Sequence, residues 1–110
     1  MRFVVVITSA FEDAVVDVVG RLADVSAVYA GRVGADCRRT MLTLDENPRR
    51  GRSVPEMDDE RLRQLTVANG AFRLMYFVNV ESRIVTLIDF QPTQRFDPTK
   101  LLAAVRHFDS

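Results

Sequence analysis

The chain has 110 residues, 47% of them hydrophobic and 27% charged, and fifteen basic side chains balance fifteen acidic ones. These values predict one globular domain over residues 1–110 and exclude a disordered chain. The longest apolar run, residues 3–7, is far shorter than the ~20 residues that span a bilayer. We also find no signal-peptide pattern and therefore expect a cytoplasmic protein without a membrane partner. A net charge of zero argues against strong nonspecific attraction to nucleic acid.

Few residues of the chain are suited to metal or nucleophilic chemistry. A single cysteine, Cys37, excludes an internal disulfide and a cysteine-rich zinc site, and His107 is the only histidine. Cys37 lies within an apolar helical stripe, which favours a buried structural thiol. The chain contains no GxGxxG, P-loop or HExxH motif. We therefore expect no metal and no cofactor.

The first half of the chain predicts a strand and two helices. Residues 2–8 are rich in β-branched side chains, which is typical of a buried strand. Ser9 and Glu12 have the spacing of a capping box, and an apolar stripe predicts a helix from there to about Leu22. A second stripe, from Ala27 to Leu44, predicts a longer helix that ends before Asn47 and Pro48. The short connection predicts an antiparallel helix hairpin.

The second half predicts three strands and a last helix. Residues 47–60 form a charged loop, and strands are expected over 61–67, 71–80 and 83–90, the first two joined by the Asn69-Gly70 turn. Asp97 and Pro98 are typical of the start of a helix, which would run to about Phe108. The predicted fold is α+β: an N-terminal strand, a helix hairpin, a three-stranded antiparallel meander and a short C-terminal helix. We expect helices to cover one face of the sheet.

The strand over residues 71–80 has two unlike faces. Its even-numbered residues are apolar and predict a core against the helix hairpin. The odd-numbered face carries Arg73, Met75 and Phe77 and is expected to stay half open, with only the last helix over it. Two interpretations of Arg73 remain open, namely an ion pair with Asp89 on the next strand and a site for a phosphate or acidic partner.

The arginine content also allows two interpretations. The chain has fourteen arginines and one lysine. Genome composition explains such a bias, but planar guanidinium groups also suit bidentate recognition that lysine cannot provide. The position on or beside the sheet selects Arg63, Arg73, Arg83 and Arg95 as the arginines of interest.

An ordered set of segments resembles the ParE/RelE superfamily of bacterial toxins. The set follows the N-terminal strand and helix hairpin and covers about residues 2–91. It consists of Leu44, the segment PRRGRSVPE at 48–56, LRQL at 62–65, FRLMY at 72–76 and RIVTL at 83–87. The resemblance implies a RelE-like/ParE-like fold and the toxin role of a type II toxin–antitoxin system, held inactive by a cognate antitoxin.

The two branches of the superfamily imply different targets. RelE-like members cleave mRNA in the ribosome with a basic and aromatic cluster that includes the strand arginine matched by Arg73. This chain departs from that pattern, because Arg95 is the only cation in the segment 89–95 and no tyrosine follows Tyr76. ParE-like members bind DNA gyrase and do not need such a cluster. We therefore predict a non-enzymatic gyrase inhibitor, with an mRNA endonuclease and a non-toxic binding domain of the same fold as alternatives.

The resemblance and the strand pattern together give a set of candidate residues. Arg73 and Arg95 would be catalytic in a nuclease. The predicted partners are an antitoxin, which would lie along the sheet or the hairpin, and either gyrase or the ribosome; a homodimer is a further expectation. The residues expected to bind the target or antitoxin are Arg63, Arg73, Met75, Phe77, Arg83, Gln91 and Arg95.

Overall fold

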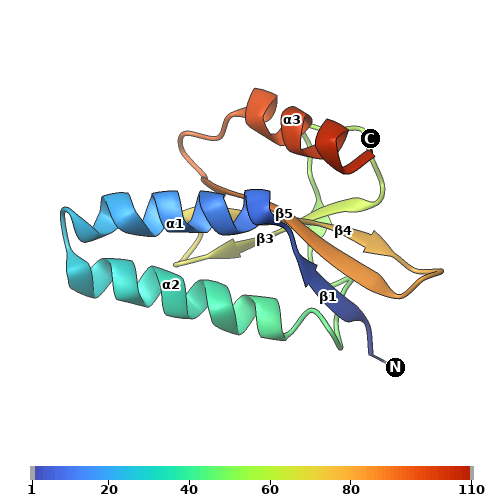
Figure 1. Ribbon diagram of the computed structural model, residues 1–110, viewed down its shortest axis with the longest axis horizontal. Coiled ribbons are helices and arrows are strands. Elements are labelled where there is room, and N and C mark those ends of the chain that lie inside the picture. Colours follow the sequence, from blue (N-terminus) through green and yellow to red (C-terminus); the bar gives the residue numbers. More distant parts are fainter. Residues whose placement is uncertain (1, 110) are drawn as a thin grey trace.

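The computed structural model describes residues 2–109. Its elements confirm the predicted α+β class and add one short strand (Figure 1). In chain order they are β1 (Val4–Ile7), α1 (Ser9–Ala23), α2 (Ala27–Leu42), β2 (Arg52–Ser53), β3 (Leu62–Val67), β4 (Phe72–Asn79), β5 (Ile84–Pro92) and α3 (Pro98–Asp109).

Five strands form one sheet in the order β1-β5-β4-β3-β2. β3, β4 and β5 form the predicted antiparallel meander, whereas β1 pairs with β5 in parallel. β2 is a two-residue edge strand antiparallel to β3, within a segment expected to be only a loop. Since β1 has only four residues and pairs with Ile84–Leu87, the rest of β5 has no paired strand on that side within residues 2–109.

The helix hairpin begins one residue earlier than the capping box predicts. Thr8, not Ser9, is the N-cap of α1: its side chain accepts a hydrogen bond from the backbone of Phe11 at 3.1 Å. The Thr8 hydroxyl also donates to the carbonyl of Leu87 on β5, which ties the helix start to the sheet and explains the choice. α2 ends at Leu42, shortly before the predicted boundary, and Leu44 is buried in the turn that follows.

The hairpin packs on one face of the sheet, as predicted from the even-numbered residues of β4. Phe11 from α1 and Val33 and Cys37 from α2 meet the sheet there. The sheet contributes an apolar set from three strands: Val67, Phe72, Leu74, Tyr76, Val78, Val85, Leu87 and Phe90. This cluster is the larger core of the molecule.

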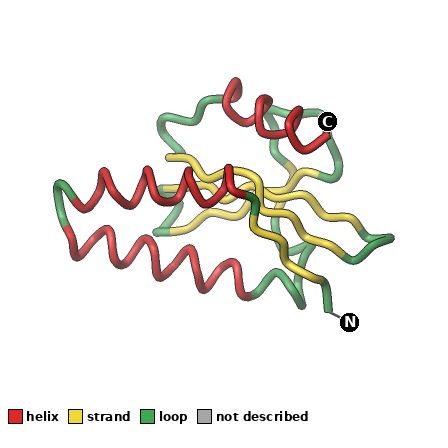
Figure 2. The backbone as a smooth tube through the Cα atoms, in the orientation of Figure 1, coloured by secondary structure: helices red, strands yellow, loops and turns green. Residues whose placement is uncertain are grey.

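The expectation that helices cover only one face is wrong. α3 packs on the opposite face, so the sheet lies between two helical layers (Figure 2). Leu101 and Val105 of α3 contact a second core that includes Met75 and Phe77, and these two side chains are 0% and 2% exposed. Met75 and Phe77 therefore do not form the half-open partner surface that was predicted. The reason is that α3 has its own apolar stripe, which must be buried against apolar sheet residues.

A β-bulge separates the two halves of β5. The register shifts between Met75 and Tyr76, so that Leu87 and Phe90 both face the hairpin although two residues lie between them. Asp89 consequently lies opposite Met75, and Gln91 lies opposite Arg73. The bulge thus gives β5 a polar end beside α3.

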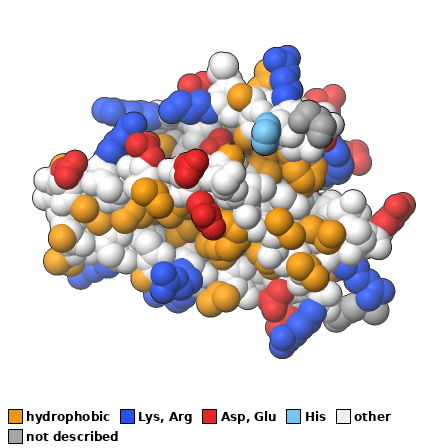
Figure 3. All heavy atoms as spheres, viewed as in Figure 1, with side chains coloured by type: hydrophobic (Ala, Val, Ile, Leu, Met, Phe, Trp, Pro, Cys, Tyr) orange, Lys and Arg blue, Asp and Glu red, His pale blue; other side chains and the backbone are white. Residues whose placement is uncertain are grey.

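Hydrophobic side chains gather along the hairpin and around β1 on the face drawn in Figure 3. Val16 on α1 is 71% exposed, and Val28 on α2 and Val4 on β1 are about as exposed. No helix within residues 2–109 has the length and apolarity needed to cross a membrane.

Candidate functional site

Three arginines meet over the β3–β4 part of the sheet. Arg73 comes from β4, Arg52 from β2 and Arg50 from the loop before it, and all three line a depression of about 460 Å³. We call this depression the arginine basin; its lining is Arg50, Arg52, Gln64, Leu65, Thr66, Arg73 and Thr93. Guanidinium groups that line one depression suit a phosphate or carboxylate ligand.

Arg73 forms a two-point ion pair with Glu56. Its Nη1 atom lies 3.0 Å and 3.1 Å from the two carboxylate oxygens, and the side chains are 16% and 27% exposed. The guanidinium also stacks over the ring of Phe96, 4.2 Å from its centroid. The interpretation of Arg73 as the partner of Asp89 is therefore wrong, because the bulged register puts Gln91 opposite it.

Glu56 is the candidate residue that sequence reasoning missed. It lies in a run of acidic residues, Glu56, Asp58, Asp59 and Glu60, which gives no sign of which member turns toward the sheet. Only the path of the chain from β2 to β3 brings this carboxylate against Arg73. A helpful signal would have been its position shortly after Val54, which is buried in the second core and fixes the loop.

Gln64 presents a buried acceptor beside the basin. The side chain is 8% exposed, and its amide nitrogen donates to the carbonyl of Ser53 at 3.2 Å. Its Oε1 atom has no hydrogen-bond partner within residues 2–109. Buried polar atoms are normally paired, so this oxygen is an exception beneath the basin.

Arg63 binds the backbone of a neighbouring loop. Its Nη1 atom donates to the carbonyl of Gly51 at 2.8 Å, so it holds the loop that carries Arg50 and Arg52. The backbone N–H of Gly51 in turn donates to the hydroxyl of Tyr76 at 3.0 Å. Burial raises the pKa of Tyr76, and the Gly51 hydrogen bond and the nearby arginines partly offset this effect. The phenol is thus neutral at physiological pH.

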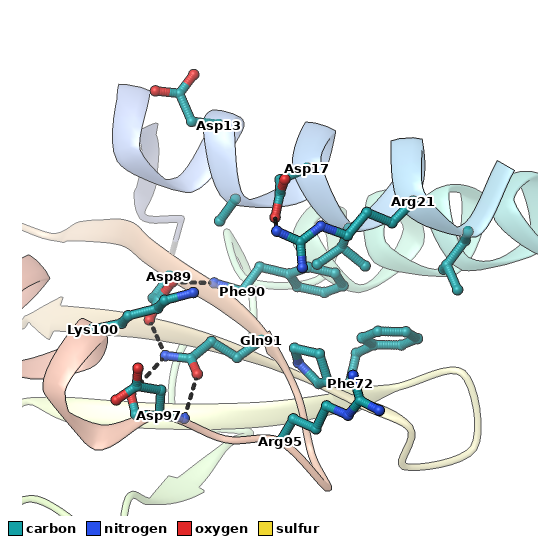
Figure 4. A pocket seen from close by; sticks show the side chains of 14 residues that line it. Asp13, Asp17, Arg21, Phe72, Asp89, Phe90, Gln91, Arg95, Asp97 and Lys100 are labelled. Atoms are coloured by element: carbon teal, nitrogen blue, oxygen red, sulfur yellow. Dashed lines mark hydrogen bonds and ion pairs between the residues drawn. The ribbon is translucent and has the colours of Figure 1, made fainter. Parts of the chain in front are cut away.

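A second cavity, of about 710 Å³, lies between α1, the end of β5 and the start of α3. Asp89 and Gln91 line it together with Arg95, and both of the first two are buried (Figure 4). Gln91 donates to Asp89 at 2.7 Å and accepts the backbone N–H of Asp97 at 2.7 Å. This network attaches the N-terminus of α3 to β5.

The structure separates the residues that were predicted to form one site. Arg73 lies in the arginine basin, Arg63 supports it, and Gln91 and Arg95 line the second cavity. Arg83 lies in the β4–β5 turn with a φ of 56° and is exposed. Its carbonyl accepts the N–H of Val4, so the residue serves the start of β1.

Three arginines line the basin, and one of them, Arg73, is paired with the carboxylate of Glu56. Within residues 2–109, no group of three or more His, Cys, Asp or Glu side chains is placed to hold a metal ion. Arg50, Arg52 and Arg63 form no ion pair with any residue of the same range. The zero net charge of the chain therefore hides a local excess of positive charge at the β2 edge.

Comparison with known proteins gives structural matches only. No protein-family profile and no curated protein matches the chain. The structure is similar to the Escherichia coli toxin RelE, solved in the free state as a double arginine-to-alanine mutant, with a TM-score of 0.62 and 18% identity over 97% of this chain and 98% of RelE. It is also similar to a chain of the Mycobacterium tuberculosis toxin–antitoxin complex RelBE2, with a TM-score of 0.52 and 15% identity over 84% of this chain and 99% of the other. The protein therefore has the fold of RelE-type toxins.

Proposed function

We propose that this protein is the toxin of a type II toxin–antitoxin pair and that it cleaves mRNA under the control of a cognate antitoxin. The observation that carries the proposal is the Arg73–Glu56 pair at the arginine basin, within a RelE-type fold. A carboxylate held by a guanidinium group, with two further arginines along the same depression, is suited to phosphodiester cleavage. The absence of the usual basic run after the last strand is offset by Arg50 and Arg52, which come from a different part of the chain.

The residues of the basin can share the steps of RNA cleavage. The 2′-oxygen attacks the adjacent phosphorus, and the bond to the 5′-oxygen breaks, which leaves a 2′,3′-cyclic phosphate and a 5′-hydroxyl group. Glu56 accepts the proton of the 2′-hydroxyl, and water supplies the proton of the leaving 5′-oxygen. Arg73, Arg50 and Arg52 stabilise the negative charge that develops on the phosphate oxygens.

The proposal is tested by expressing the chain from an inducible promoter and mapping the ends of cellular mRNA. We expect new mRNA ends within minutes, and loss of about 10²-fold or more of the cleavage in Arg73→Ala and Glu56→Gln. Arg83→Ala is the matched control, since it removes an arginine far from the basin. Messages that stay intact while growth stops would overturn the nuclease proposal. Unimpaired growth would favour the non-toxic binding domain.

A second target, DNA gyrase, is favoured by a different observation. The α1–α2 hairpin exposes Val16, Val25 and Val28, at 71%, 89% and 67%, which is suited to contact with a protein. Under this proposal, induction raises the level of cleaved-DNA gyrase complexes and the SOS response while mRNA stays intact. Val16→Ser together with Val28→Ser would relieve toxicity, whereas Arg73→Ala would not.

The antitoxin is proposed on the same grounds as the toxin role. Among the similar structures, one is a toxin–antitoxin complex. We expect a neighbouring reading frame to encode a small protein that forms a stable complex with this chain and suppresses its toxicity. Co-expression of that frame, followed by size-exclusion chromatography, tests the complex and distinguishes it from a homodimer of this chain. Restored growth without complex formation would contradict direct neutralisation.

A further inference from the structure

Gly51 is bound on both sides of its backbone by side chains from the sheet. It is a buried residue, its N–H donates to the hydroxyl of Tyr76 at 3.0 Å, and its carbonyl accepts Nη1 of Arg63 at 2.8 Å. Tyr76 lies on β4 and is 0% exposed, so its hydroxyl is a fixed point of the core. The loop before β2 is therefore attached to the core at one residue.

Only glycine fits this position. A Cβ atom on Gly51 would lie 2.5 Å from the Tyr76 hydroxyl oxygen and 2.6 Å from the carbonyl oxygen of Gln64. Since one of these contacts is backbone in a paired strand, it cannot yield without disturbing the β2–β3 pairing, which begins at Arg52 and Gln64. The close approach of the loop to the sheet thus depends on the missing side chain.

The two residues on either side of Gly51 are Arg50 and Arg52, both of which line the arginine basin. Both are exposed, and Arg50 is further held by a hydrogen bond from its Nη1 to the hydroxyl of Thr43 at 3.0 Å. On a mobile loop, two long arginine side chains would lose much conformational entropy on binding a ligand. An anchor between them reduces that cost.

We propose that the Tyr76 hydroxyl, acting through Gly51, is a positioning group that holds Arg50 and Arg52 ready for the phosphate backbone of single-stranded RNA. This inference rests on the proposed nuclease function and assigns the RNA-backbone contact to a defined pair of arginines. Tyr76 itself does not touch RNA, because it lies in the core beneath the loop. Its neutral phenol makes the effect independent of pH across the neutral range.

The substitution Tyr76→Phe isolates the hydroxyl group. The ring stays in the core, but the buried N–H of Gly51 loses its acceptor, which favours a shifted loop. We expect affinity for a single-stranded RNA 20-mer, measured by fluorescence anisotropy, to fall by about five- to tenfold if roughly one hydrogen bond of preorganisation is lost. Tyr29→Phe, in which the other tyrosine is changed on α2, is the matched control and should bind like the wild type.

The salt dependence of binding separates positioning from a loss of folding. Each phosphate contact to single-stranded RNA contributes a slope of about −0.7 to log K against log salt. Arg50→Gln combined with Arg52→Gln should therefore reduce the slope by about 1.4. Tyr76→Phe should reduce it in the same direction, and adding Tyr76→Phe to the arginine double variant should change nothing further. A fall in folded fraction alone would leave the slope of the remaining folded protein unchanged.

Arg63→Lys provides a second variant should Tyr76→Phe fail to fold. It keeps the positive charge but loses the rigid guanidinium that holds the Gly51 carbonyl, so the same weaker binding and smaller slope are expected. Wild-type binding with no change in these variants, or a Tyr76 effect that adds to the arginine double variant, would overturn the inference, as would wild-type protein that does not bind RNA. Binding that follows these expectations without any mRNA cleavage would refute the nuclease proposal alone.

Discussion

The two faces of the sheet differ in how completely helices cover them. The α1–α2 hairpin closes one face with an apolar core that extends along β4 from Phe72 to Val78. α3 is shorter and closes the other face only around Met75 and Phe77. Next to this second core, the same face carries Arg73 and the arginine basin. A short helix on one side of a five-stranded sheet thus leaves room for a site.

The residues of β4 determine where the apolar contact between the sheet and α3 ends. A guanidinium is costly to bury without a partner, so the apolar layer under α3 stops at Arg73. Glu56 and Phe96 pair with this arginine and cover most of it, so that its side chain is 16% exposed. The hairpin face has no such residue and is closed throughout. Function is therefore expected on the α3 face of the sheet, which has the smaller core.

The largest effects on stability are expected at Leu74 and Met75, since these neighbours lie on opposite faces of the sheet and both are 0% exposed. We expect Leu74→Ala and Met75→Ala each to lower the free energy of unfolding by about 2–5 kcal/mol, because each leaves a cavity in a packed core. Urea denaturation measures both. A cost below about 1 kcal/mol for Met75→Ala would mean that α3 does not close its face.

Unlike Leu74 and Met75, Arg73 should matter for mRNA cleavage and little for stability. Arg73→Gln should reduce mRNA cleavage by about 10²-fold or more while changing the free energy of unfolding by less than about 1 kcal/mol, because its ion pair is partly exposed. The measurements are cleavage in cells and urea denaturation of the same variant. A large loss of stability would instead identify the Arg73–Glu56 pair as part of the fold.

Removal of the cap at the N-terminus of α3 should have a smaller effect on stability. Oδ1 of Asp97 accepts the N–H of Thr99 at 2.9 Å, which is a helix cap as the sequence predicts. Asp97→Ala should cost about 1 kcal/mol. Ser26→Ala, at the cap of α2, is the matched change on the hairpin face. In Asp97→Ala, amide hydrogen exchange should become faster within α3 only. Equally faster exchange in β4 would contradict two separate cores.

Acid should weaken a contact on the hairpin face, and this is the smallest of the expected effects. The backbone N–H of Ala68, which donates to Asp36 at 2.6 Å, together with the nearby Arg39 lowers the pKa of that carboxyl, and burial opposes this only in part. A pKa that is lower in the folded state stabilises the fold above the unfolded pKa, near 4, and this contribution is lost as pH falls through the folded value. Asp36→Asn should therefore flatten the pH dependence of urea midpoints below about pH 4. An unchanged profile would show that the contact does not stabilise the fold.

The sequence predicted one face of the sheet better than the other. Period-two alternation in residues 71–80 identified the hairpin core from Phe72 to Val78, because those side chains are all apolar, but it also included Val80, which is 50% exposed. The other face mixes Arg73 with Met75 and Phe77, and the pattern did not tell which of them α3 would cover. The bulge in β5 was also invisible in the sequence, and it placed Asp89 opposite Met75 and Gln91 opposite Arg73.

Local signals in the sequence determined the α+β class, the helix hairpin, the Asn69-Gly70 turn and the start of α3 at Asp97, since capping, turn and periodicity rules act within a few residues. Tertiary structure alone decided the parallel pairing of β1 with β5, the place of α3 on the second face and the pairing of Glu56 with Arg73. It also decided that Gly51 lies against Tyr76, 25 residues away in the chain. These contacts join distant segments, and their energies depend on shape and charge that no local pattern records.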